Sequence, residues 1–169
     1  LDDISLRLTT FIPPEENVRI FLLESSAPCR VHWCAPVQLA PEPEDRHHCT
    51  VTVENGVFTA ENPRCVTPST RLFAGCSLPW TDTGTDIGRF LLGEYSSPLR
   101  CGHPGFGGTF TLDGAAVLVC GTGDIAPWLD VEKARAALEE TRQWWQKKIL
   151  VLTAETPDRD LNRLLHGWA

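Results

Sequence analysis

TVTVENGVFTAE, residues 50–61, carries the clearest structural signal in the chain. Apolar and polar residues alternate on both sides of Asn55-Gly56, which is the pattern of two half-buried strands. A two-residue hairpin turn needs positive φ at both central positions, and Asn-Gly is the pair that tolerates this best. The segment therefore predicts a β-hairpin with strands at 50–54 and 57–61.

Short apolar segments also lie on both sides of this hairpin, separated by turns rich in Gly, Pro and Ser. They cover residues 4–9, 18–23, 29–39, 71–76, 88–92, 108–112 and 115–119. Many short strands at this spacing are typical of antiparallel sandwiches and barrels. We therefore expect the first three quarters of the chain to form one mainly β domain.

The pattern changes at Asp130, a residue type that caps helix N-termini. From Glu132 to about Lys148 the sequence is charged on one side and apolar on the other, which predicts an amphipathic linker helix. Its apolar face comprises Val131, Ala134, Leu138, Thr141 and Trp145.

A second amphipathic helix is expected at the end of the sequence. Thr156 can cap it, and Pro157 suits the first helical position because its missing N–H costs nothing there. The apolar stripe of this helix comprises Leu161, Leu164, Leu165 and Trp168. Such a stripe must pack against something. We expect its partner to lie beyond residue 169, in a longer protein.

Composition narrows the possible functions. The chain has 169 residues, 15 of them basic and 22 acidic, and a formal net charge of −7. This balance argues against a nucleic-acid partner or an anionic membrane surface. No apolar run approaches the roughly 20 residues of a transmembrane helix. We also expect no signal peptide, because the sequence opens without a basic stretch followed by an apolar run. Seven cysteines without a C-x-x-C pair are typical of reduced thiols, so we expect a cytoplasmic protein.

Several motifs imitate functional sites without meeting their requirements. The cluster His47-His48-Cys49 follows a polar loop, and we expect an exposed pair of histidines there and no metal. GTGDIA at 121–126 resembles a dinucleotide turn, but the expected helix starts too late and Asp124 would face the pyrophosphate. The glycine-rich segment 102–108 lacks the Lys-Ser/Thr pair of a phosphate loop, which favours a mobile surface loop.

Catalytic patterns are also missing from the sequence. No G-x-S-x-G elbow presents a nucleophilic serine. The carboxylates of Asp82, Asp86 and Glu94 are of the type that forms acid/base pairs, but their ordinary role is in turns. Among six tryptophans, Trp80 follows a proline in a turn and is the best candidate for an exposed indole that stacks on a sugar ring.

Taken together, these segments resemble the inverting glycoside phosphorylases, the family of cellobiose and chitobiose phosphorylase and of the phosphorylase-like domain of cyclic β-1,2-glucan synthase. The resemblance spans nearly the whole chain. It rests on FIPPEENVRI at 11–20, on TDIGRFLLG at 85–93, and on the linker with its TPD at 156–158, which is the most specific element. The matching residues are Phe11, Pro13, Asp86, Phe90, Gly93, Trp145, Thr156, Pro157, Asp158 and Trp168.

The chain departs from the family pattern at two positions. Ile87 stands where the family usually has Arg, with Arg89 two residues later. His166 stands where the family usually has Asn before the final x-Trp pair. Any sugar-facing contact of the family's arginine is therefore in doubt here.

The resemblance implies an architecture: a supersandwich-like antiparallel β-sandwich at 1–127, a helical linker at 128–155, and at 156–169 the first helix of an (α/α)6 catalytic barrel. In that family, phosphate attacks the anomeric carbon while a barrel aspartate protonates the leaving oxygen, which gives a sugar 1-phosphate. This segment would then hold no catalytic residue, metal or cofactor, and inorganic phosphate would be a co-substrate of the parent enzyme.

The resemblance also implies partners: an oligosaccharide, the chain's own catalytic barrel, and a second copy in a homodimer. The candidates for residues near the substrate are Trp80, Asp86, Arg89 and His103. Two alternatives stay open. The chain could be a stand-alone carbohydrate-binding module, or a structural domain of a related glycoside hydrolase or of an inactive relative.

Overall fold

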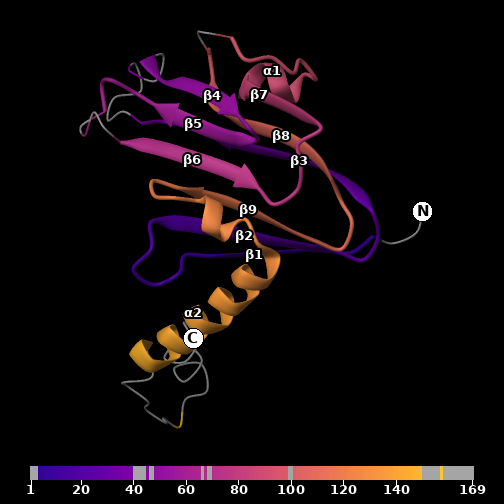
Figure 1. Cartoon of the computed structure of the whole chain (residues 1–169), viewed down its shortest axis with the longest axis vertical. Helices are drawn as coiled ribbons and strands as arrows, with labels where there is room; N and C mark the ends of the chain where they lie inside the picture. The colour runs from indigo at the N-terminus through magenta and orange to yellow at the C-terminus, as the bar shows by residue number, and fades with distance from the viewer. Residues whose placement is uncertain are drawn as a thin grey trace.

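The computed structural model describes residues 4–39, 48–65, 70–98 and 101–149, together with positions 45, 67 and 157. Figure 1 shows two layers of strands and one long helix that runs away from them. The elements are β1 (Leu6–Phe11), β2 (Val18–Ser25), β3 (Cys29–Pro36), β4 (Thr50–Glu54), β5 (Val57–Glu61), β6 (Arg71–Cys76), β7 (Asp82–Asp86), α1 (Ile87–Leu91), β8 (Pro104–Leu112), β9 (Ala115–Gly121), the 3-10 turn η2 (Ala126–Trp128) and α2 (Val131–Ile149).

Two antiparallel sheets form a sandwich. The larger has the order β1-β2-β9-β6-β5-β4, and the smaller has the order β3-β8-β7. Phe58 and Leu118 of the larger sheet meet Phe106, Phe110 and Leu112 of β8, and all five side chains are at most 1% exposed. The prediction of a mainly β antiparallel sandwich followed by a helix is therefore confirmed.

The hairpin of β4 and β5 is confirmed in register. Val53 lies opposite Phe58, and the turn residues Asn55 and Gly56 have φ values of 50° and 79°. These are the positive φ angles that a tight hairpin turn requires.

Strand β9 shows why one segment reads as a continuous apolar run. Its side chains alternate between the two faces of the larger sheet: Ala116 and Leu118 pack toward the smaller sheet, whereas Val117 and Val119 pack toward α2. Because both faces are covered, both sets must be apolar. The sheet is thus a shared middle layer between the smaller sheet and α2.

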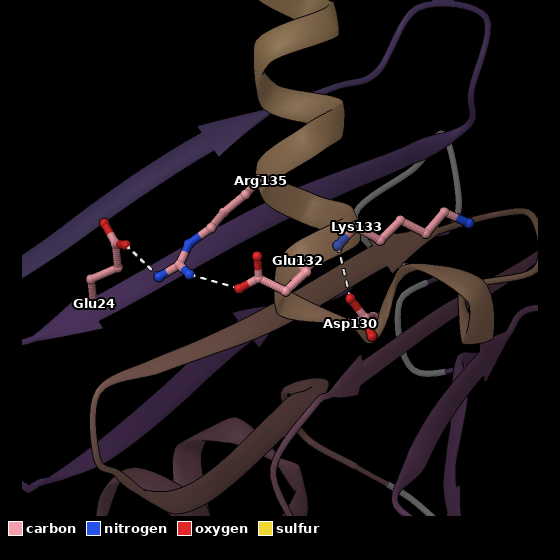
Figure 2. Close-up of polar contacts among 5 residues, drawn as sticks. All are labelled: Glu24, Asp130, Glu132, Lys133 and Arg135. Atoms are coloured by element: carbon pink, nitrogen blue, oxygen red, sulfur yellow. Dashed lines mark hydrogen bonds and ion pairs between the residues drawn. The ribbon is translucent and has the colours of Figure 1, made fainter.

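Helix α2 begins as the sequence predicts. The Asp130 carboxylate accepts a hydrogen bond of 2.8 Å from the backbone N–H of Lys133 (Figure 2). Ala134 is fully buried and Ala137 is 6% exposed, so small side chains bring the first half of the helix close to the sheet. Farther along, Trp145 is 49% exposed.

Two local predictions are wrong. Residues 88–92 form no strand, because 87–91 are the short helix α1, capped by Asp86. The glycine-rich segment 102–108 is no surface loop either, because residues 104–108 are the buried first half of β8, the central strand of the smaller sheet.

The glycines of β8 are explained by what packs against them. A Cβ atom at Gly107 would lie 2.7 Å from the Phe90 ring, and one at Gly108 would lie 2.3 Å from the Trp80 ring. The strand therefore gives up side chains so that aromatic rings on either face can lie directly on its backbone.

Edge strand β1 keeps an apolar face open. Leu8 lies opposite Leu23, which is buried between the sheets, yet Leu6 and Leu8 are 54% and 59% exposed. The smaller sheet therefore does not cover this edge.

The helices within the described ranges include none that is long and apolar enough to cross a membrane. Apart from Pro157, the expected helix at 156–169 lies outside the described residues, as does most of the polar loop at 41–46. The predicted division at 127 and 155 stays a prediction.

Candidate functional site

Three of the four candidate residues meet where α1 begins beside the start of β8. Asp86 is 5% exposed, and its Oδ1 accepts hydrogen bonds from the backbone N–H groups of Gly88 (3.1 Å) and Arg89 (3.4 Å). Its Oδ2 accepts a shorter bond of 2.7 Å from the N–H of Gly102. One carboxylate thus caps the helix and ties it to the segment before β8.

His103 lies on the other side of the same junction. Its carbonyl accepts a hydrogen bond of 2.9 Å from the N–H of Ile87. A Cβ atom at Gly88 would lie 3.0 Å from His103 Nδ1 and 3.3 Å from Asp86 Oδ1, so the imidazole and the carboxylate flank the glycine. The side chains of His103 and Arg89 are exposed. That these residues lie near a substrate stays a prediction.

The carboxyl group of Asp86 is held in its ionised form. Burial acts to raise its pKa, but hydrogen bonds from the backbone N–H groups of Gly102, Arg89, His103 and Gly88 outweigh this effect and lower the pKa below its ordinary value of 3.8. A general acid at neutral pH needs a raised pKa. The lowered pKa of Asp86 therefore suits a carboxylate that stabilises the fold and does not suit a general acid.

Replacing Asp86 should destabilise the junction in a pH-dependent way. We expect Asp86→Ala to lower the free energy of unfolding at pH 7 by about 1–2 kcal/mol, the usual cost of losing a helix cap. The pKa of Asp86 is lower in the folded chain than its ordinary value of 3.8, which applies in the unfolded chain. The ionised carboxylate therefore stabilises the fold at pH values above 3.8, and this stabilisation is lost as the pH falls through the folded pKa. Urea unfolding at several pH values measures this pH dependence of the free energy of unfolding.

The matched variant Asp86→Asn keeps a capping side chain that does not titrate. The difference in free energy of unfolding between this variant and the wild type should become smaller below about pH 4. A difference that stays constant down to pH 3 would contradict the assignment of a stabilising ionised carboxylate.

Trp80 does not join this group, and the expectation of an exposed indole is wrong. Its ring is half-buried and stacks on Trp33 at a centroid distance of 6.0 Å and an interplanar angle of 19°. Phe58 and Phe110 contact it edge-on, each at 5.6 Å. Its Nε1 donates a hydrogen bond of 2.8 Å to the carbonyl of Gly56. Trp80 thus belongs to the aromatic interior, where its indole N–H is satisfied.

All seven cysteines are free thiols in the structure. Burial raises the pKa of Cys49 and of Cys76 to about 11 and that of Cys120 to about 12. At neutral pH such groups are protonated and unreactive, so they act as small apolar side chains. Among the described residues, no group of three or more His, Cys, Asp or Glu side chains could hold a metal ion.

A charged groove between α2 and the first two strands was missed by the sequence reasoning. It has a volume of about 460 Å³ and is lined by Arg7, Thr9, Leu22, Glu24, Arg135, Leu138 and Arg142. Figure 2 shows Arg135 between two carboxylates. One guanidinium nitrogen lies 3.0 Å from Glu24 Oε1 on β2, and the other lies 2.7 Å from Glu132 Oε1 on its own helix.

Only part of this groove could have been found from the sequence. Glu132 and Arg135 are three residues apart on the expected helix, which is the spacing of a helical ion pair. Glu24 lies 111 positions before Arg135, and their contact depends on how α2 crosses the sheet. No local pattern encodes that crossing.

Comparison with known proteins adds one finding about the fold. No family model matches the chain, and no curated protein matches it. Part of a bacterial glucoamylase shares this fold. That enzyme was crystallised with acarbose, and the superposition has a TM-score of 0.54 at 10% sequence identity.

The match covers 89% of this chain and 25% of the glucoamylase chain, so this chain spans about a quarter of the glucoamylase's length. At this identity the likeness shows the fold alone. The chain therefore resembles a β-sandwich domain of a carbohydrate-active enzyme.

Proposed function

We propose that this chain is the non-catalytic β-sandwich and linker of a carbohydrate-active enzyme. The observation that carries the proposal is the fold shared with part of a bacterial glucoamylase over 89% of this chain. The catalytic residues would then lie in another part of the protein. Helix α2 supports the proposal, because Trp145 near its C-terminal end is 49% exposed and is available for a further contact.

We further propose that the parent enzyme is a glycoside phosphorylase, which cleaves β-linked di- or oligosaccharides with phosphate. The segment at 85–93 supports this, because each residue that matches the family has a role in the fold. Asp86 caps α1, Phe90 is 3% exposed and packs against Gly107 of β8, and Gly93 has a φ of 82°. The matching residues of this segment would then be ones that maintain a fold shared with the family.

The departure at Ile87 fits the same interpretation. Its side chain is 8% exposed, and a Cβ atom at Gly105 would lie 2.4 Å from its Cγ1. An arginine in this orientation would bury its charge. We therefore propose no sugar contact at this position.

The remaining assignments are proposals on the same basis. The partners would be an oligosaccharide, the chain's own catalytic barrel and a second copy in a homodimer, and the location would be the cytoplasm. The open apolar face of β1, with Leu6 and Leu8 more than half exposed, offers a surface for one of these protein contacts.

The test is an assay of the complete gene product on a panel of β-linked disaccharides with and without inorganic phosphate. We expect sugar 1-phosphate to appear only when phosphate is present. Release of free sugar alone, at a rate independent of phosphate, would contradict the phosphorylase proposal and identify a hydrolase. Activity in neither condition would point to a structural domain of an inactive relative.

A further inference from the structure

The groove between α2 and the first two strands gathers basic side chains on an acidic chain. Arg7 comes from β1, whereas Arg135 and Arg142 come from α2. The net charge of the whole chain is −7. Three guanidinium groups and one carboxylate, that of Glu24, line the groove. The residues that line the groove thus carry a net positive charge, while the carboxylates of Glu132 and Glu139 lie beside it, in contact with Arg135 and Arg142.

The three arginines differ in how they are paired. Arg135 is held by two carboxylates, those of Glu24 and Glu132, at 3.0 and 2.7 Å. Hydrogen bonding to Glu24 raises the pKa of Arg135, so this group stays charged and fixed in position. Its role is to neutralise Glu24, the carboxylate that would otherwise repel an anion from the groove.

The other two guanidinium groups remain open to a ligand. Arg7 lies opposite Glu24 across the strands, but Glu24 is bonded to Arg135, and Arg7 has no ion pair among the residues that the structure describes. Arg142 lies 3.8 Å from Glu139, and both side chains are about 60% exposed. An exposed pair at this distance is weak and can be displaced.

We propose that this groove is a binding site for a phosphate group, carried by inorganic phosphate or by a small phosphorylated metabolite. Arg7 and Arg142 would bind the phosphate oxygens, because planar guanidinium groups match them with paired hydrogen bonds. The Thr9 hydroxyl offers a further donor, and Leu22 and Leu138 provide an apolar floor. This site is independent of the catalytic activity proposed above.

The experiment is a titration of the ¹⁵N-labelled chain at constant ionic strength, followed by NMR, with inorganic phosphate in one series and glucose 6-phosphate in another. We expect saturable shifts confined to amides of β1, β2 and α2. Arg7→Gln and Arg142→Gln should each weaken binding about ten-fold, as expected for the loss of one charge-assisted contact. Both side chains are exposed, so neither variant should unfold the chain.

Arg71→Gln is the matched control. Arg71 is an exposed arginine on β6 that is paired with Glu61 at 3.1 Å, outside the groove. It should bind both probes like the wild type. Tighter binding of glucose 6-phosphate would identify a phosphorylated metabolite as the ligand, and equal binding would identify phosphate itself. Chemical shifts that do not saturate, or an affinity that falls equally in all three variants, would overturn the proposed site.

Discussion

Gly108→Ala is expected to lower the free energy of unfolding by about 3 kcal/mol, at the upper end of the usual cost of overpacking. The added Cβ atom would lie 2.3 Å from both Cε3 and Cζ3 of Trp80. That ring cannot easily move away, because it stacks on Trp33 and its Nε1 is bonded to the carbonyl of Gly56. Urea denaturation followed by circular dichroism measures the loss.

Gly123→Ala is the matched control for this substitution. No heavy atom lies within 4 Å of a Cβ built at Gly123. We expect its stability to stay within about 0.5 kcal/mol of the wild type, as for most surface substitutions. If the two variants lost equal stability, the close packing of Trp80 on β8 would be wrong.

Trp80→Ala should cost a comparable amount, about 3–4 kcal/mol, because it removes a large ring from the aromatic interior. It would leave a cavity beside Phe58 and Phe110, and it would also break the hydrogen bond to Gly56 that joins this ring to the hairpin turn. The melting temperature and the urea midpoint should both fall.

Trp145→Ala serves as the comparison, because Trp145 is 49% exposed on α2. We expect it to change stability by less than about 1 kcal/mol. Comparable losses from the two tryptophans would contradict the assignment of Trp80 to the interior.

The features that the sequence predicts correctly are those with local causes. The Asn55-Gly56 turn needs only its own two residues, and the start of α2 needs only Asp130 and the residues that follow it. Alternating apolar residues likewise placed most strands, since the period of two depends on neighbours along the chain.

The errors arose where a distant side chain determines the local structure. The glycines at 102–108 led to the prediction of a loop. Gly107 and Gly108 instead lie in a strand, where Phe90 and Trp80 occupy the space that larger side chains would need. The sequence predicted an exposed turn residue at Trp80, because the partners of this ring, such as Trp33, lie far away in sequence. The charged groove was missed for the same reason, since it joins β1 to α2.

We propose that this chain acts as a scaffold and is not itself a sugar-binding module. The most direct test is a calorimetric titration of the folded chain with β-linked di- and oligosaccharides, with the complete gene product as the reference. We predict no saturable binding to the isolated chain and clear binding to the complete product. Saturable binding of an oligosaccharide to the isolated chain, with an affinity equal to that of the complete product, would contradict the claim and identify a carbohydrate-binding module.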